Sequence, residues 1–247
     1  MVFILSGDNK SMNDEIKTVL SPRLQVVLGF VGGGGSSSVK VLADIGTDHA
    51  YLPIAAVQNG FCEAAIACDL HPGPLALADR NVRDARLIGK IETRLGDGLS
   101  PILPGEANCI VIAGMGGMRI WGILSEGMAQ VRQAQRLILQ PQHDTELMRR
   151  NLHTAGVEIE DESVVREVVG GREHFYVVIK ARYTGESVSW SEREYFLGKF
   201  LVAKGGEDFT AFVKREKEKI DAYISQIRDK SALCNAHERI NWLQSCL

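Results

Sequence analysis

The stretch Val39-Lys-Val-Leu-Ala-Asp-Ile-Gly-Thr-Asp-His-Ala-Tyr-Leu-Pro53 decides the fold. Its first half, Val39–Ile45, is a short apolar run that predicts a buried strand, and Pro53–Asn59 predicts a helix. Gly46 lies between them, where a residue without a side chain lets the backbone pass close to a ligand. A single glycine does not make the G-x-G-x-x-G pattern, so a nicotinamide dinucleotide is disfavoured.

Outward from this stretch, strands and helices alternate. Gly- and Pro-rich turns separate the predicted segments, which indicates βαβ units and a buried parallel sheet. Two strand-like runs then follow, Val157–Val169 and His174–Arg182, and Gly170-Gly171 between them predicts a hairpin. Five parallel strands that end in a hairpin are typical of the Rossmann-like class I methyltransferase sheet, an α/β fold. The further predicted strands are Ala64–Cys68, Ile91–Leu95, Cys109–Ala113 and Leu137–Gln140, and the further predicted helices are Pro74–Leu87, 117–125 and a segment from Thr145, capped by Asp144 and ended by Gly156.

The two ends of the chain differ from this alternating pattern. Ser21-Pro22 predicts the start of a helix, and the Gly/Ser run 32–38 that follows is a flexible connector, because it lacks the Lys-Ser/Thr ending of a P-loop. After Thr184 three helical stretches are expected, over 191–204, 208–229 and 232–246, with coiled-coil-like apolar spacing. We therefore expect a flexible N-terminus (1–20), a catalytic domain (21–184) and a small α-helical C-terminal domain (185–247).

The composition fits a globular protein with a sizeable core. The chain has 247 residues, 45% of them hydrophobic and 24% charged, with a net charge of −3. With this net charge, binding to a nucleic acid would require Lys and Arg side chains clustered on one face to neutralise phosphates. The five cysteines form no CxxC pair, which suits reduced thiols in the cytoplasm. The histidines show no metal-ligand spacing, and no apolar run suits a signal peptide or a membrane span, so no metal or membrane partner is expected.

Acidic residues follow three successive predicted strands. Asp44 closes the first strand, Asp69 closes the second, and Asp97 follows the third. In a doubly wound sheet, ligands lie at the carboxyl ends of the strands, where an acid after the second strand accepts hydrogen bonds from ribose hydroxyls. A carboxylate after the third strand can accept from the exocyclic amine of an adenine. Together the three acids predict a pocket for an adenosine without phosphates, which S-adenosylmethionine fits.

Glycines gather after the fourth predicted strand, in Ala113-Gly-Met-Gly-Gly117. A tight turn explains part of this run, and the surplus suggests that a planar substrate base approaches the backbone there. On this basis the substrate side of the site is expected to include Tyr51, Met115, Gly116, Gly117 and Gln140.

Five motifs together resemble the bacterial tRNA (adenine-22-N1)-methyltransferase family. The order and spacing are similar from about Ser21 to Lys180, roughly two thirds of the chain. Asp69 stands where the family often has Glu, and the Gly/Ser run is longer than is usual in the family. The motifs are Asp-Ile-Gly-Thr-Asp-His-Ala-Tyr-Leu-Pro (44–53), Gly-Pro-Leu (73–75), Gly-Asp-Gly-Leu (96–99), Ile-Ala-Gly-Met-Gly-Gly (112–117) and Leu-Ile-Leu-Gln-Pro (137–141).

The resemblance implies a cytoplasmic, S-adenosylmethionine-dependent enzyme that methylates N1 of a tRNA adenine. The acid proposed for catalysis in the family corresponds to Asp48, which could equally cap the following helix. The cofactor-binding positions of the family correspond to Gly46, His49, Asp69, Asp97, Gly98, Ala113 and Gly114, beside Asp44.

For RNA contact, we expect a row of basic residues on the helix after the second strand, and we expect the protein to act as a monomer. Two alternatives share the pocket: a methyltransferase for a small molecule or protein, and a non-catalytic module that binds a nucleoside or RNA. An NAD-dependent oxidoreductase is a weaker third. The basic residues are Arg80, Arg83, Arg86 and Lys90, with Arg149 and Arg150 further along the chain.

Overall fold

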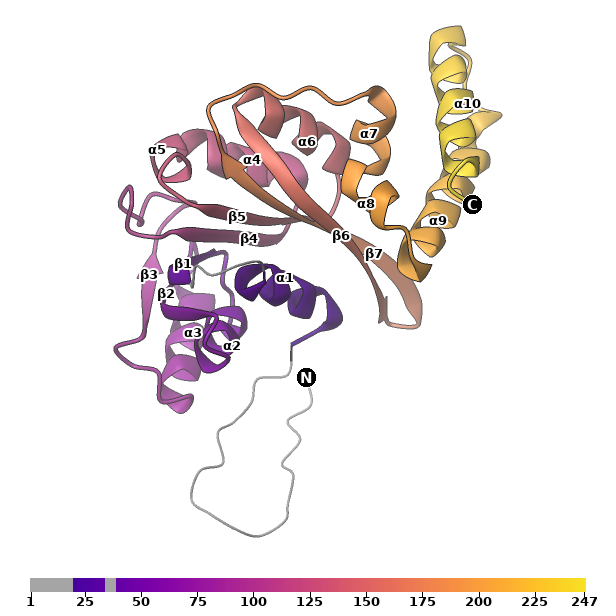
Figure 1. Ribbon diagram of the computed structural model, residues 1–247. Helices are drawn as coiled ribbons and strands as arrows, with labels where there is room; N and C mark the ends of the chain where they lie inside the picture. Colours follow the sequence, from indigo (N-terminus) through magenta and orange to yellow (C-terminus); the bar gives the residue numbers. More distant parts are fainter. Residues whose placement is uncertain (1–19, 34–38) are drawn as a thin grey trace.

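A seven-stranded mixed sheet forms the centre of the molecule, in the order β3-β2-β1-β4-β5-β7-β6 (Figure 1). The computed structural model describes residues 20–33 and 39–247. Strands β1 to β5 are parallel, and β7 and β6 are antiparallel to their neighbours. The strands are β1 (Val39–Ile45), β2 (Cys62–Asp69), β3 (Ile91–Leu95), β4 (Cys109–Met115), β5 (Arg136–Pro141), β6 (Val157–Val169) and β7 (Arg172–Tyr183).

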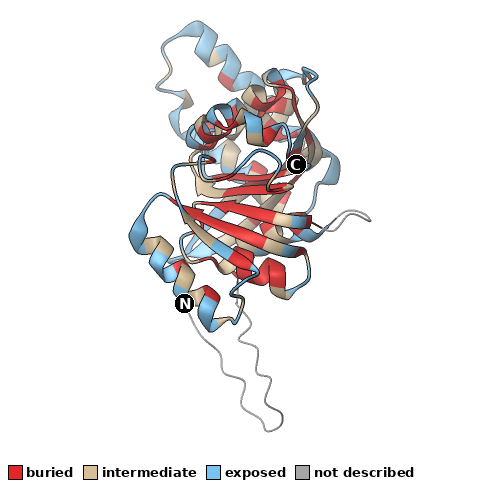
Figure 2. Ribbon diagram, turned by 90° about the vertical axis from the view of Figure 1, so that its left-hand side faces the viewer, coloured by how far each residue is buried: buried red, intermediate tan, exposed pale blue. Residues whose placement is uncertain are grey.

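Helices cover both faces of this sheet, and the strands between them are buried (Figure 2). One apolar layer joins the sheet to α1, α2 and α3, and the other joins it to α4, α5 and α6. The predicted Rossmann-like α/β sheet with its C-terminal hairpin is therefore confirmed. The helices are α1 (Pro22–Gly32), α2 (Tyr51–Gln58), α3 (Pro72–Asp84), α4 (Gly117–Glu126), α5 (Met128–Val131) and α6 (Thr145–Thr154).

The C-terminal region is helical, as predicted, and its apolar residues continue the core of the sheet. Buried Tyr195, Leu201 and Phe209 belong to the same cluster as Leu137 and Ile179 of the sheet. The last two helices pack side by side as a hairpin (Figure 1). These helices are α7 (Glu192–Leu197), α8 (Lys199–Lys204), α9 (Glu207–Ile224) and α10 (Lys230–Gln244).

The prediction of one continuous helix over 191–204 is wrong, because the helix is interrupted at Gly198. Its φ of 92° ends α7, and a Cβ there would lie 2.7 Å from Arg149 Nη2 and 3.0 Å from Glu162 Oε2. Arg149 and Glu162 form a buried ion pair, Nε to Oε1 at 2.7 Å. Only glycine fits against this pair in a left-handed conformation, so a long-range contact sets the break.

Two residues expected as helix caps make no capping hydrogen bond. Asp144 occupies the N-cap position of α6, and for Asp48 capping was one of two expected roles. Asp144 precedes α6 but has a φ of 59° and no capping hydrogen bond, and its carboxylate contacts His143 Nδ1 at 2.7 Å instead. Asp48 does not cap α2, whose N-cap is Ala50. The predictions for the N-terminus up to residue 19 and for the connector at 34–38 fall outside the described residues.

Candidate active site

The loop after β1 has an unusual backbone that determines where its side chains point. Gly46, Asp48 and Ala50 have φ values of 75°, 54° and 57°. The N–H groups of Gly46 and Thr47 both donate to Cys68 O at 2.9 Å, which ties the loop to the end of β2. A left-handed conformation at a residue with a side chain costs on the order of 1 kcal/mol or more and occurs most often where function requires it.

Asp69 joins this loop to the following one. Its Oδ2 accepts a hydrogen bond from the Asp48 N–H at 3.1 Å, and its Oδ1 accepts from the His71 N–H at 2.9 Å. The residue is only 8% exposed. Each oxygen retains a lone pair, so these two hydrogen bonds leave Asp69 able to accept from ribose hydroxyls, the role expected from its position after β2.

A cavity of about 550 Å³ opens at the ends of β2 and β3. Asp69, Asp97 and Gly98 line it together with the apolar side chains of Met115 and Ile123. The structure thus brings together two of the three acids predicted from the sequence. An apolar cavity with carboxylates on one side suits a nucleoside with free ribose hydroxyls.

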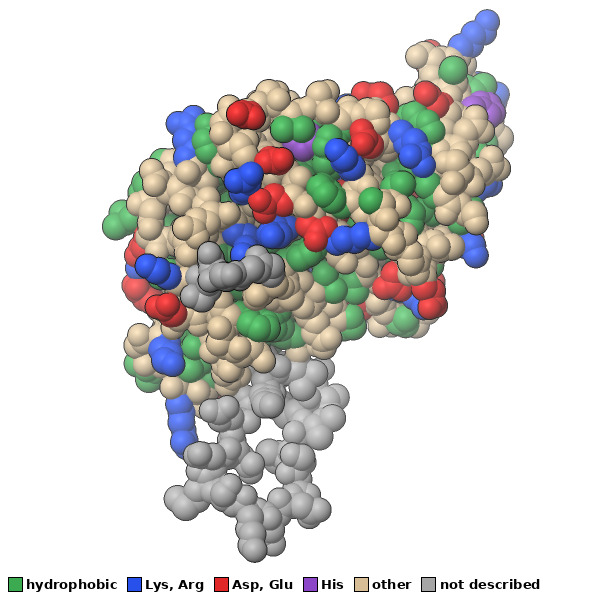
Figure 3. Space-filling model, in the orientation of Figure 1, with side chains coloured by type: hydrophobic (Ala, Val, Ile, Leu, Met, Phe, Trp, Pro, Cys, Tyr) green, Lys and Arg blue, Asp and Glu red, His purple; other side chains and the backbone are tan. Residues whose placement is uncertain are grey.

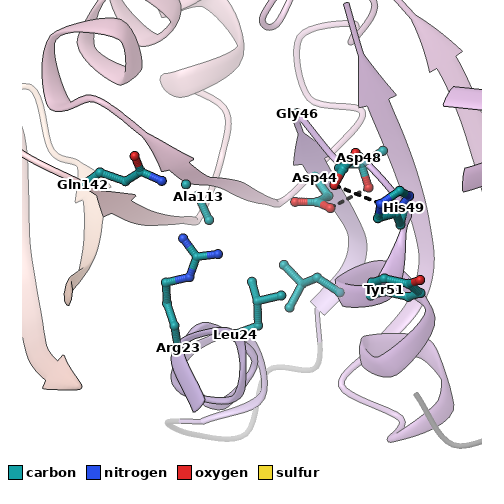
Figure 4. A pocket seen from close by; sticks show the side chains of 12 residues that line it. Arg23, Leu24, Asp44, Gly46, Asp48, His49, Tyr51, Ala113 and Gln142 are labelled. Carbon is teal, nitrogen blue, oxygen red and sulfur yellow. Dashed lines mark hydrogen bonds and ion pairs between the residues drawn. The ribbon is translucent and has the colours of Figure 1, made fainter. Parts of the chain in front are cut away.

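A second cavity, of about 250 Å³, lies between the β1 loop and the end of β4 (Figure 4). Gly46 lines both cavities, and a Cβ at this position would clash with Met115 Cε. Gly46 is thus a wall residue of both cavities, and no side chain fits there. The predicted residues that line the second cavity are Asp44, Gly46, Asp48, His49, Tyr51, Ala113 and Gly114.

Asp44 is the most strongly perturbed acid of the site. Burial raises its pKa to about 6, the hydrogen bond from the Thr47 hydroxyl opposes this shift, and the charge of Asp69 adds to it. The Thr47 Oγ1 to Asp44 Oδ2 distance is 2.6 Å. A buried carboxylate whose described partner is a hydroxyl, at the end of a strand, favours a positively charged ligand.

The glycines after β4 have a different explanation from the predicted one. A Cβ on Gly116 would lie 2.5 Å from His143 Cε1, and a Cβ on Gly117 would lie 2.8 Å from His143 O. Both positions are filled by the loop after β5, so a planar substrate is not needed to account for them. Gly114 alone of the three lines a cavity.

Gln140 is fully buried and holds other residues in place, whereas the sequence suggested direct substrate contact. Its Oε1 accepts from the Gly114 N–H at 3.1 Å and from Arg23 Nη1 at 3.0 Å, and its Nε2 donates to Pro141 O at 2.7 Å. Both polar atoms of its side chain are therefore engaged within the protein.

Arg23 is a site residue that the sequence analysis missed. It comes from α1, points toward Ala113 and Gln142, and lines the second cavity (Figure 4). Among the described residues, Arg23 Nε and His49 Nδ1 are buried side-chain nitrogens without a hydrogen-bond partner, and both belong to this cavity. One feature of the sequence could have identified Arg23: it is the only charged residue of α1.

The predicted RNA-contacting arginines are more dispersed than expected. Arg80 and Arg83 pair with Asp84 and Asp79 one turn away on α3, and Arg86 is exposed. None of the three lines either cavity. Basic and acidic side chains are interspersed on the face shown in Figure 3.

The expectation that Arg149 contacts RNA is wrong. Its side chain is 1% exposed and paired with Glu162, so it is unavailable to RNA. Arg150 is held by Glu146 and Glu192.

Two general findings bear on partners. Across residues 20–33 and 39–247, no three His, Cys, Asp or Glu side chains are grouped so that they could hold a metal ion. Within the same ranges, no helix has the length and apolar character needed to cross a membrane.

The fold and the site define a class I S-adenosylmethionine-dependent methyltransferase. The features that identify this class are the antiparallel β7, the acid at the end of β2 and the two cavities that share Gly46 in their lining. The model of the TrmK family, tRNA (adenine(22)-N(1))-methyltransferase, matches residues 42–245. The chain belongs to this family, which confirms the resemblance seen in its motifs.

Similar proteins agree with this assignment. The tRNA (adenine(22)-N(1))-methyltransferase of Bacillus subtilis (strain 168) is 42% identical over 148 residues, which span 60% of each chain. The crystal structure of Streptococcus pneumoniae Sp1610 in complex with S-adenosyl-L-methionine has a TM-score of 0.81 and 31% identity, covering 93% of this chain and 100% of that one. M. capricolum TrmK with S-adenosyl-homocysteine has a TM-score of 0.74 and 27% identity, covering 92% and 96%.

Proposed function

We propose that the chain transfers the methyl group of S-adenosylmethionine to N1 of adenine 22 in tRNA, with Asp48 as the catalytic carboxylate. The position of Asp48 carries the proposal. Its side chain is 63% exposed, lines the second cavity, and caps no helix, although its backbone is held in a left-handed conformation. A residue constrained in this way without a structural role for its side chain is a candidate for function.

The residues present fit the cofactor. Asp69 and Asp97 offer acceptors for ribose hydroxyls and an adenine amine, and Gly98 keeps the first cavity open beside them. On the other side of Gly46, Asp44 offers a buried negative charge and Arg23 a cation with an unpartnered Nε. An amino acid carries one group of each sign, so this cavity suits the methionine part.

When bound, S-adenosylmethionine supplies an electrophilic methyl group on a sulfonium that leaves as a neutral thioether. Adenine N1 has a free lone pair, so no base is needed before it attacks. The methylated ring is a cation, and the Asp48 carboxylate stabilises that charge and accepts a hydrogen bond from the N6 amine. His49 Nε2, 3.2 Å from Asp48 Oδ2, helps to hold the carboxylate in place. The target base must be unpaired to expose N1.

Supporting roles follow the sequence expectations. We assign Tyr51, Met115 and Ala113 to the space around the methyl group, because they line the two cavities near Gly46. The catalytic domain (21–184) and the helical domain (185–247) act together as a cytoplasmic monomer. Arg80, Arg83 and Arg86 are proposed to contact tRNA phosphates.

The test uses purified protein, S-adenosylmethionine and unmodified bacterial tRNA, followed by nuclease digestion and mass spectrometry of the nucleosides. We expect 1-methyladenosine from the native protein and almost none from Asp48→Asn, which should still bind the cofactor. A tRNA with guanine in place of adenine 22 should remain unmethylated. If the cofactor binds but no tRNA nucleoside gains a methyl group, a small-molecule or protein substrate replaces tRNA in the proposal.

A further inference from the structure

The β6–β7 hairpin extends beyond the edge of the sheet where the cavities open. Strand β5 pairs with β7 from Leu137↔Ala181 to Leu139↔Ile179 and ends at Pro141. The two hairpin strands continue to pair as far as Val169↔Arg172. Since β5 is parallel to β1 and β4, this extension projects past the carboxyl ends of the strands that carry the site (Figure 1).

One face of the extension carries a row of flat groups that ends at the second cavity. The rings of His174 and Tyr176 are stacked, with centroids 6.2 Å apart and planes 11° apart. The Arg23 guanidinium lies 5.1 Å from the centre of the Tyr176 ring, and Arg23 lines the cavity. We call His174, Tyr176 and Arg23 the stacking row.

The exposure of the stacking row differs along its length, and the neighbouring residue Phe175 faces the other way. His174 is exposed and Tyr176 is half-buried, whereas Phe175 on the opposite face packs against Phe212 of α9, with ring centroids 6.2 Å apart. Glu167 lies directly across from His174 in the β6–β7 pairing. A carboxylate at this place disfavours a phosphate next to His174 but does not prevent a base from stacking on the ring.

We propose that the stacking row holds the unpaired nucleotides next to the target adenosine of the tRNA, a role that rests on the proposed function. The target base must leave its helix for its N1 to be methylated, so its neighbours lose stacking partners. Aromatic rings and arginine planes replace such partners for any base, because every base has a π-face. The stacking row runs from the exposed hairpin to the cavity that Asp48 lines. The RNA strand could follow this row to the site.

The decisive variant is His174→Ala, because His174 does not line the cavity and its described ring contact is with Tyr176. Loss of one stacking partner should raise the KM for tRNA roughly tenfold and leave kcat and the cofactor Kd within about twofold. Tyr176→Ala should also raise the KM, and Tyr176→Phe should restore it because the ring is kept. His237→Ala is the matched control, since His237 is exposed on α10 and its described hydrogen bond is to Leu233 O of the same helix.

A direct readout uses tRNA with 2-aminopurine beside the target adenosine. The fluorescence of 2-aminopurine is quenched when this base stacks. Binding to native protein should quench it, and His174→Ala should remove most of that quenching. If the native protein forms 1-methyladenosine but His174→Ala has an unchanged KM and unchanged quenching, the proposal is overturned. If the native protein forms none, the proposed function itself has failed. A change in oligomeric state in His174→Ala would instead assign this face to contact with a second copy and overturn the RNA assignment.

Discussion

The Asp48 N–H donates a hydrogen bond to Oδ2 of Asp69, with the two atoms 3.1 Å apart. This bond links the proposed catalytic residue to the residue that is placed to bind the cofactor ribose. Asp69 therefore has two functions, one toward the ligand and one toward the loop that presents Asp48. The two functions can be separated experimentally.

We expect Asp69→Asn to lower both cofactor affinity and turnover. Both Asp69 oxygens accept backbone N–H groups, so an amide must turn its NH₂ toward one donor, and the loop must shift. The cofactor Kd should rise about tenfold or more, and kcat should fall even at saturating cofactor. Asp97→Asn is the matched control, because Asp97 lines the same cavity, whereas the Asp48 N–H bonds to Asp69. A normal kcat in Asp69→Asn at saturation would disprove the linkage.

The raised pKa of Asp44 makes a prediction about stability and pH. Its folded-state pKa is about 6 against an ordinary value of 3.8, so the folded protein binds the proton more tightly than the unfolded chain. At low pH both states are protonated. As the pH rises from about 4 to about 6, ionisation of Asp44 lowers the free energy of unfolding by up to ~3 kcal/mol.

Urea denaturation of native protein and Asp44→Asn at pH 4.5 and pH 7 tests this, because the asparagine removes the titrating group and can keep the contact with Thr47. The variant should gain stability relative to native protein on going from pH 4.5 to pH 7. Equal pH dependence of the two proteins would show that Asp44 is not buried in the way described.

The proposed phosphate contacts of α3 can be measured through salt. Replacing Arg80, Arg83 and Arg86 together by Gln should reduce the slope of log affinity for tRNA against log salt by roughly 0.7–0.9 for each phosphate that is no longer neutralised. Arg80 and Arg83 already have carboxylate partners on the same helix, so Arg86→Gln alone should account for the largest single change. An unaltered slope in the triple variant would remove α3 and the turn after it, which carries Arg86, from the RNA interface.

Local patterns predicted the strands well where sharp turns bound them. The segments Ile91–Leu95 and Val157–Val169 have the predicted limits, because Gly96 follows the first and Gly170-Gly171 follows the second. The acids Asp69 and Asp97 could be placed in one pocket because parallel strands carry their carboxyl ends to the same edge.

Features that depend on distant contacts could not be predicted in this way. Arg23 reaches the site only because α1 packs against β5, β6 and β7, which brings Arg23 to Gln140, its partner 117 residues away in the sequence. Arginine is usually a surface residue. Arg149 is buried against Glu162 only because α6 packs against β6. Neither fact is present in spacing or periodicity.

The Arg149–Glu162 pair makes the last prediction, about how the C-terminal helices are held. Arg149 Nη1 donates to Tyr195 O at 2.8 Å, and Glu162 Oε2 lies 3.0 Å from the position of a Cβ on Gly198. Gly198→Ala should lower the free energy of unfolding by about 2–4 kcal/mol, from backbone strain and displacement of the pair. Gly122→Ala in α4 is the control, because it meets no atom within 4 Å and should be neutral or stabilising. Thermal and urea unfolding of both variants measure this. If the two alanines have equal effects, the ion pair does not require the glycine, and the break between α7 and α8 needs another cause.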